Sequence, residues 1–194
     1  MNEQQWDRKL HIQTTGRLDS HADQYNYPYE PTPYTVLERL AESGYIRKEN
    51  ILLDYGCGKG RVGFFLHHRV GCQVIGLEYE PDIYAQAQEN LKQYTRKEGV
   101  SFFCENAAEF VIKEADCFYF FNPFSVEVLR SAMGRILDSY YEEPRKMRLF
   151  FYYPNDEYLL YLMTQYALSY VGEIGCGDLF PDDVRERILI FELL

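Results

Sequence analysis

Three glycines at alternate positions follow a short apolar run in the first third of the chain. Residues 51–61 read ILLDYGCGKGR, in which the apolar run ends at Asp54 and the glycines are Gly56, Gly58 and Gly60. Glycine loses more backbone entropy on folding than any other residue, so such a turn is costly unless its backbone needs that freedom. A strand, a glycine-rich turn and a helix N-terminus together present backbone N–H groups to a ligand. We therefore expect a ligand to lie against this turn.

An acidic residue at the end of the next apolar run narrows the class of ligand. Glu78 ends the run QVIGLE and lies 18 residues after Gly60. In nucleotide-binding βαβ units, an acid about 20 residues further on accepts hydrogen bonds from ribose hydroxyls. The dinucleotide pattern G-x-G-x-x-G fails because Arg61 stands where its third glycine belongs, and no G-K-[ST] follows for a phosphate loop. The spacing favours a ligand with a ribose, and Glu80 remains a rival to Glu78.

These two segments resemble the first two motifs of class I S-adenosylmethionine-dependent methyltransferases. LLDYGCGKG is similar to the first motif, and VIGLEYEP is similar to the second, which ends in the ribose-binding acid. The resemblance extends in element order over residues 29–193 and implies S-adenosyl-L-methionine as the cofactor. It implies that the following residues bind this cofactor: Asp54, Gly56, Cys57, Gly58, Gly60, Glu78, Tyr79, Asn106, Ala107 and Asn122. Members of the class more often have Asp at the position of Asn106.

The segment FFNPFS, at the end of the fourth expected strand, lies where these enzymes place groups that face the transferred methyl. Asn122-Pro123-Phe124 resembles the [DNS]-P-P-[YF] motif of amino-methylating members, shortened by one proline. The resemblance implies a catalytic Asn122, whose side-chain oxygen accepts an N–H of the acceptor and orients its nitrogen. It implies substrate contacts for Pro123 and Phe124. An Asn-Pro turn also forms for conformational reasons alone, and Phe124 fits a core position equally well.

Upstream of the glycine turn, NYPYEPTPY is rich in tyrosine and proline. It is similar to a segment of some amino-methylating enzymes that covers the methionine end of the cofactor. This implies that Tyr29 and Thr32 contact the cofactor and Tyr27 contacts the substrate. The alternative is a helix entry with tyrosines as packing residues. The partner of Arg61 stays open between a cofactor carboxylate and an acidic neighbour.

Past residue 32, strand-length apolar runs alternate with helix-patterned stretches, which is typical of an α/β fold with a mainly parallel sheet. We expect strands at 51–54, 73–78, 100–106, 117–124 and 148–155, and helices from Pro33, at 60–70, 81–97, 107–112, 125–141 and 157–166. Thr32 and Ser125 suit N-caps. The runs 168–174 and 185–193 read as an antiparallel pair. The prediction is a Rossmann-like methyltransferase fold with about seven strands, helices on both faces and a C-terminal antiparallel hairpin.

The length of 194 residues suits a single full-sized core. We expect one S-adenosylmethionine-binding domain over 31–194, preceded by an aromatic-rich extension or lid over 1–30. The first 30 residues show no clear periodicity, although Trp6 and several tyrosines lie there.

Composition limits the partners. The net charge of −10 opposes a large nucleic-acid footprint, because phosphate contacts need clustered Lys and Arg. No apolar run reaches a membrane span and the N-terminus lacks a signal peptide's apolar stretch, so we expect a cytoplasmic protein with no membrane contact. The 5 cysteines contain no C-x-x-C pair, and we expect no metal site. The oligomeric state stays open.

The leading hypothesis is an S-adenosylmethionine-dependent methyltransferase acting on an unidentified acceptor, with an amino nitrogen of a small molecule or protein side chain as the candidate. One alternative is a protein that binds the nucleoside without transferring a methyl group. A nicotinamide-dependent oxidoreductase is a weaker alternative, disfavoured by Arg61 in the glycine pattern.

Overall fold

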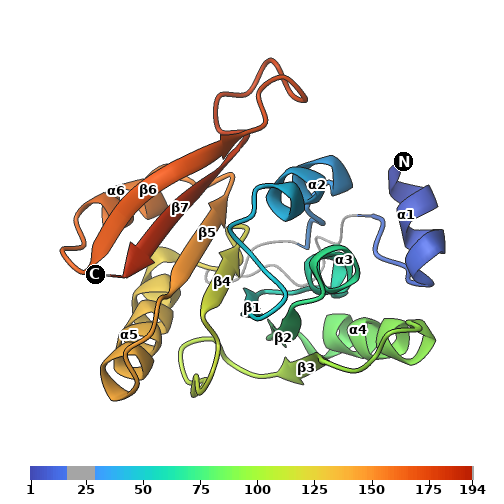
Figure 1. Ribbon diagram of the computed structural model, residues 1–194, viewed down its shortest axis with the longest axis horizontal. Coiled ribbons are helices and arrows are strands. Elements are labelled where there is room, and N and C mark those ends of the chain that lie inside the picture. The colour runs from blue at the N-terminus through green and yellow to red at the C-terminus, as the bar shows by residue number, and fades with distance from the viewer. Residues whose placement is uncertain (17–28, 194) are drawn as a thin grey trace.

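The computed structural model describes residues 1–16 and 29–193. The strands of this part of the chain form one sheet in the order β3-β2-β1-β4-β5-β7-β6 (Figure 1). The first five strands run parallel, and β7 is antiparallel to both β5 and β6. The bounds are β1 Ile51–Tyr55, β2 Gln73–Glu78, β3 Val100–Cys104, β4 Cys117–Phe120, β5 Arg148–Tyr152, β6 Leu168–Gly175 and β7 Arg187–Leu193.

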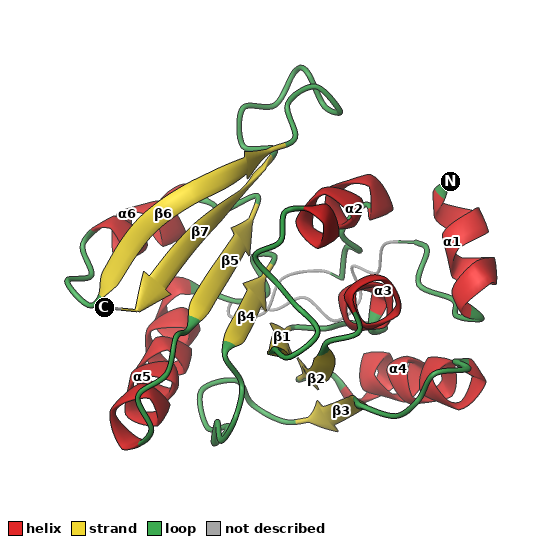
Figure 2. Cartoon of the chain, viewed as in Figure 1, coloured by secondary structure: helices red, strands yellow, loops and turns green. Residues whose placement is uncertain are grey.

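Helices cover both faces of the sheet (Figure 2). Their bounds are α1 Glu3–Leu10, α2 Tyr34–Glu42, α3 Arg61–Val70, α4 Pro81–Gln93, α5 Val126–Glu142 and α6 Asp156–Met163. The four helices α1, α2, α3 and α4 pack on one face of the sheet through a first hydrophobic core. The helices α5 and α6 pack on the other face through a second core. Successive side chains of a strand point to opposite faces, so Leu52 belongs to the first core and Leu53 to the second. The predicted fold class is confirmed, including its C-terminal antiparallel hairpin.

Three predicted helices differ from the observed ones. The predicted helix over 107–112 is wrong, because residues 107–109 form only a turn in the link between β3 and β4. The helix α4 ends at Gln93 rather than residue 97, because Tyr94 takes an extended conformation and is buried, with its hydroxyl donating to the Phe64 carbonyl at 3.3 Å. The helix α6 starts one residue before the prediction and ends at Met163, three residues early.

The N-terminal segment contains a helix that periodicity did not indicate. Asn2 caps α1: its side chain accepts the N–H of Gln5, and the Gln5 side chain accepts the N–H of Asn2. Trp6 is 2% exposed and packs against Phe65 of α3, with ring centroids 4.8 Å apart. Residues 1–16 therefore contribute to the first core, while the division of the chain at residue 30 stays a prediction.

The two predicted N-caps also differ from expectation. Pro33, not Thr32, is the N-cap of α2, and it offers no side-chain hydrogen bond. Ser125 is the N-cap of α5, but its hydroxyl makes no capping bond. The Thr32 hydroxyl is instead directed to Tyr119 of β4.

The sheet order sets the position of the site. Ligands of open α/β sheets bind beyond the carboxyl ends of the strands, at the point where the strand order reverses. That point lies between β1 and β4, and the carboxyl end of β2 is adjacent. The glycine turn, Glu78 and the Asn122 segment therefore converge on one edge.

None of the helices among the described residues combines the length and apolar character needed to cross a membrane.

Candidate active site

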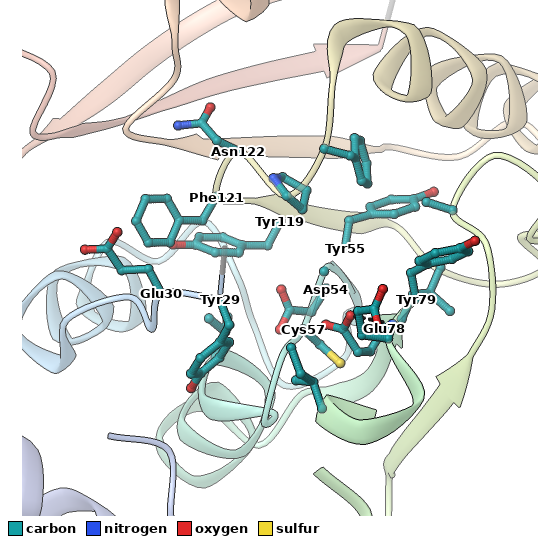
Figure 3. Close-up of a pocket in the computed structure, with 18 of the residues that line it drawn as sticks. Tyr29, Glu30, Asp54, Tyr55, Cys57, Glu78, Tyr79, Tyr119, Phe121 and Asn122 are labelled. Atoms are coloured by element: carbon teal, nitrogen blue, oxygen red, sulfur yellow. Dashed lines mark hydrogen bonds between the residues drawn. The ribbon is translucent and has the colours of Figure 1, made fainter. Parts of the chain in front are cut away.

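Two loops meet at the carboxyl edge of the sheet and line one cavity (Figure 3). The glycine turn follows β1, and Asn122 and Pro123 follow β4. Gly56 has φ +67°, and a Cβ placed on it would lie 2.3 Å from the Cβ of Pro123. Asn122 has φ 39°, a left-handed conformation that asparagine adopts more readily than most residues. Both the backbone conformation and the approach of Pro123 therefore require glycine at position 56.

Glu78, the last residue of β2, connects this strand to the glycine turn. Its Oε2 accepts the backbone N–H of Gly58 at 2.9 Å, and its Oε1 accepts the N–H of Glu80 at 2.9 Å. Burial raises the pKa of the Glu78 carboxyl, and these backbone donors oppose the rise. Each carboxylate oxygen has a second lone pair, so Glu78 can still accept hydrogen bonds from hydroxyls in the cavity.

Asp54 of β1 brings a second buried carboxyl to the cavity. It is 2% exposed, and its Oδ2 has no hydrogen-bond partner among the described residues. Burial raises the pKa of Asp54 well above its usual range, and the nearby Glu78 carboxylate adds to the rise. A buried carboxyl oxygen without a partner is costly, and a cationic ligand group would satisfy it. This chemistry fits the α-ammonium of S-adenosylmethionine.

The backbone of Cys57 connects the glycine turn to β2, and its thiol is unreactive. Its backbone N–H donates to the Leu77 carbonyl at 2.8 Å, which ties the turn to β2. Burial first, and then the Asp54 and Glu78 carboxyls, raise the pKa of the Cys57 thiol well above its ordinary value. A thiol held neutral in this way is a packing group, not a nucleophile.

The segment before α2 forms one wall of the cavity. The Tyr29 ring lies against the glycine turn so closely that a Cβ on Gly58 would be 2.2 Å from it. The hydroxyls of Thr32 and Tyr119 share a hydrogen bond of 3.0 Å. Tyr29 and Thr32 both line the cavity, and their contact with the cofactor stays a prediction. Tyr27, the predicted substrate contact, lies outside the described residues.

Arg61, the first residue of α3, is bound by the N-terminal segment. The side chain is 3% exposed and forms an ion pair with Glu3 of α1. Its Nε donates to the Thr14 hydroxyl at 2.7 Å, and its guanidinium lies 4.4 Å from the centre of the Tyr34 ring. The sequence left the partner of Arg61 open between a cofactor carboxylate and an acidic neighbour. In the structure Arg61 pairs with an acidic neighbour, Glu3.

The Asn122 side chain is bonded to the loop after β5. Its Nδ2 donates to the Tyr153 carbonyl at 2.5 Å, and its Oδ1 accepts the N–H of Asn155 at 3.2 Å. Asn122 therefore joins the end of β4 to the end of β5. Phe124, two residues later, lines the cavity but is only 4% exposed and packs in the second core beside Tyr55.

Apolar and aromatic side chains line the cavity end nearest β2 and β3. Tyr79 is 52% exposed, while Ile83 of α4 is buried, and both line the cavity. Asn106 and Ala107 follow β3, and the Asn106 Oδ1 accepts the N–H of Ala108 at 3.0 Å. This bond holds the loop in a tight turn beside the apolar surface of Ile83, which suits a flat ring.

The structure brings most of the predicted residues to this one cavity, namely Tyr29, Thr32, Asp54, Gly56, Cys57, Glu78, Tyr79, Asn106, Ala107, Asn122, Pro123 and Phe124. Gly58 and Gly60 are not among the lining residues. The backbone N–H of Gly58 donates to the Glu78 carboxylate, and Gly60 is the N-cap of α3.

The lining residues that were not found from the sequence include Glu30, Tyr119 and Phe121. The alternation of β4 offered a signal for Tyr119 and Phe121, since residues two apart share a face and Tyr119 belongs to the first core. Glu30 gave no signal apart from its place beside Tyr29.

The strand order, the glycine turn after β1 and the buried acid at the end of β2 define the fold as that of class I S-adenosylmethionine-dependent methyltransferases. Residues 52–141 match the model of the methyltransferase domain family. This stretch runs from β1 into α5 and contains the glycine turn, Glu78 and Asn122. The match covers a little under half of the chain, and over this stretch the chain is similar to methyltransferase domains.

Two curated proteins are similar over part of the chain. A histone-lysine N-methyltransferase, H3 lysine-79 specific, from Dictyostelium discoideum is 38% identical over 63 residues, which are 32% of this chain and 3% of that protein. An uncharacterized RNA methyltransferase from Chlamydia pneumoniae is 39% identical over 66 residues, 34% of this chain and 16% of that protein. The chain thus matches less than a fifth of either relative.

Among solved structures, an RNA methyltransferase from Salinibacter ruber in complex with S-adenosyl-L-homocysteine has a TM-score of 0.55 and 19% identity. The similarity covers 84% of this chain and 92% of that one. At this identity the likeness concerns the fold.

Proposed function

We propose that the cavity binds S-adenosylmethionine and that the chain transfers its methyl group to an acceptor. The observation that carries this proposal is the pair of buried carboxyls at the glycine turn. Asp54 has an oxygen without a partner among the described residues, and Glu78 has free lone pairs beside the turn. A ligand with an ammonium and a ribose diol matches this pair. The similar fold solved with S-adenosyl-L-homocysteine supports the same ligand.

Each part of the cavity has a proposed role. S-adenosylmethionine supplies a methyl group bonded to a positively charged sulfur, which a nucleophile can attack. Asp54 binds the ammonium, Glu78 binds the ribose hydroxyls, and Tyr79 and Ile83 flank the purine. Tyr29 lies over the glycine turn and excludes water from the methionine end. The chain then acts by orientation and exclusion of water, without a covalent intermediate.

We further propose an amino nitrogen as the acceptor atom and a small molecule or a protein side chain as the acceptor. The net charge of −10 supports acceptors other than long nucleic acids. Asn122 lines the cavity, and its side-chain amide bonds to the loop after β5 support a role in positioning that loop. If Asn122 only positions the loop, Asn122→Ala lowers the thermal stability and the turnover together. If its oxygen binds the acceptor N–H, Asn122→Ala lowers turnover while stability is retained.

The test is transfer of a labelled methyl group. The chain is incubated with S-adenosylmethionine carrying a labelled methyl and with size-fractionated cell extract, and the labelled product is identified by mass spectrometry. We expect the wild type to label one fraction and Glu78→Ala to lose most of that labelling. The matched control, Glu89→Ala on the solvent face of α4, should label like the wild type. Binding of S-adenosylhomocysteine without any transfer would replace this proposal by that of a non-catalytic binder.

A further inference from the structure

Glu30 places a carboxylate at the cavity end opposite the nucleoside residues. In Figure 3 the side chain of Glu30 lies next to Phe121 and Tyr119, whereas Glu78 and Tyr79 lie at the other end. Glu30 therefore has no role in the proposed binding of ribose or purine. It borders the part of the cavity that lies away from the residues assigned to the ribose and purine.

Aromatic rings form the walls of this end. Phe121 packs on Tyr152 and Tyr153 of the β5 end, with ring centroids 4.6 Å and 6.4 Å apart. The Tyr119 ring lies on the same side, held by the hydrogen bond of its hydroxyl to Thr32. Faces of aromatic rings attract cations, and the attraction grows when water is excluded.

The charges around the cavity are predominantly negative. The charged residues that line it are the five acids Glu30, Asp54, Glu78, Glu80 and Glu105 and the base Arg61. The guanidinium of Arg61 is already paired with Glu3. A cation entering the cavity therefore meets an attractive field, and an anion meets a repulsive one.

The hairpin between β6 and β7 adds further acidic side chains next to the aromatic rings that Phe121 contacts. Glu186 accepts the Tyr152 hydroxyl at 2.6 Å. Its pKa is raised mainly by burial, with Asp183 and Glu30 as neighbouring carboxylates that add to the rise. The Arg185 guanidinium lies 4.3 Å from the centre of the Tyr153 ring and pairs with Asp183. The chain thus already holds one of its own cations by a ring face and a carboxylate here.

We propose that the end of the cavity bounded by Glu30, Tyr119 and Phe121 selects a cationic amine as the acceptor. This inference rests on the proposed methyl transfer and names its substrate class. The ring faces and the Glu30 carboxylate bind the amine as its ammonium form. The amine then releases one proton to water before its nitrogen can react. Acceptors with a carboxylate at the same place are rejected by the surrounding acids.

The test compares two probes of equal shape, 4-(trifluoromethyl)benzylamine and 4-(trifluoromethyl)benzyl alcohol, by fluorine NMR titration. Both probes are titrated into the full chain, once with and once without saturating S-adenosylhomocysteine. We expect the ammonium to bind at least about fivefold more tightly than the alcohol, as a carboxylate and a ring face together suggest. Equal affinities of the two probes would overturn the inference.

Two variants locate the effect. Glu30→Gln should reduce the preference for the ammonium by about threefold or more, because it removes one negative charge at this end of the cavity. Glu49→Gln, an equal charge change at an exposed residue outside the cavity, should leave the preference unchanged. A preference that Glu30→Gln leaves intact contradicts the inference. Failure of S-adenosylhomocysteine to bind contradicts the proposed function instead, so the two failures are distinguishable.

Discussion

The carboxylate of Glu78 accepts the backbone N–H of Gly58 at 2.9 Å across the space between β2 and the glycine turn. This bond ties the acid that would bind the ribose to the loop that would bind the methionine end. The shape of the turn therefore depends on the acid, and the position of the acid depends on the turn. Loss of either residue should disturb both halves of the site.

The first prediction concerns Glu78. Glu78→Ala should weaken S-adenosylhomocysteine binding by about 10- to 100-fold, because hydrogen bonds to a charged group contribute about 1.5–3 kcal/mol. Calorimetry measures the change, and Glu89→Ala, an exposed acid of α4, should bind within about twofold of wild type by the same arithmetic. Equal affinity of Glu78→Ala and wild type would remove Glu78 from the site.

The second prediction contrasts two glycines. Gly58→Ala should abolish measurable cofactor binding, because a Cβ there lies 2.2 Å from the Tyr29 ring and φ is +56°. Gly134→Ala in the middle of α5 meets no atom within 4 Å. It should stabilise the chain by roughly 0.5–1 kcal/mol, since alanine is the better helix former. Urea unfolding and calorimetry check the pair, and full binding by Gly58→Ala would refute the close packing of Tyr29 on the turn.

The third prediction concerns pH. Burial and then the Glu78 carboxylate raise the pKa of Asp54 well above the ordinary 3.8, so the folded chain keeps a proton that the unfolded chain releases. The stability from this proton is fully present below the unfolded-state pKa and is lost as pH rises through the folded-state pKa. Without ligand, Asp54→Asn should therefore be increasingly favoured over wild type as pH rises above about 4.

Thermal unfolding of wild type and Asp54→Asn across pH measures this difference, in which the titration of groups distant from Asp54 cancels. At neutral pH we expect the variant to melt at a higher temperature than wild type in the absence of ligand. The same variant should bind S-adenosylhomocysteine more weakly, because an amide cannot pair with the ammonium. A constant difference across pH would show that Asp54 is not the titrating group.

The fourth prediction concerns the N-terminal segment. Arg61→Ala should destabilise the chain by roughly 2–4 kcal/mol, because it breaks a partly buried ion pair and removes the hydrogen bond to Thr14. Protease cleavage near α1 should rise in parallel. Arg69→Ala, which breaks a surface pair with Glu42, should cost less than about 1 kcal/mol. Equal effects of the two variants would contradict a structural role for the Glu3–Arg61 pair.

Much of the fold followed from local patterns. The alternation of apolar runs and helix-patterned stretches predicted the parallel sheet, and the turn-rich stretch before β7 predicted the antiparallel pair. The prediction of a helix over 107–112 was wrong because residues 107–109 form only a turn, in which the Asn106 side chain accepts the N–H of Ala108. Short apolar runs leave helix and loop ambiguous.

The missed helix α1 had a local signal that periodicity did not use. Asn2 and Gln5 have the spacing of a capping box, and Trp6 and Leu10 are four apart on one helical face. The partner of Arg61 had no such signal, because Glu3 lies 58 positions away in sequence. Only the packing of α1 on α3 brings the two together.

The candidate site also has a part that the sequence predicts and a part that it does not. Glycines and acids at strand ends are legible in sequence, because their backbone conformation and spacing are local. The hydrogen bonds of the Asn122 side chain to the loop after β5 could not be predicted from the sequence, because they depend on the pairing of β4 with β5 in the folded sheet. Glu30 reaches the cavity through the path of the chain before α2, which no pattern encodes.

The most direct test of the central claim is calorimetric titration of the wild-type chain with S-adenosylhomocysteine. We expect one-to-one binding that strengthens as the pH rises and Asp54 becomes ionised. Absence of binding heat across this pH range, together with an unchanged melting temperature, would contradict the assignment of the cavity to S-adenosylmethionine.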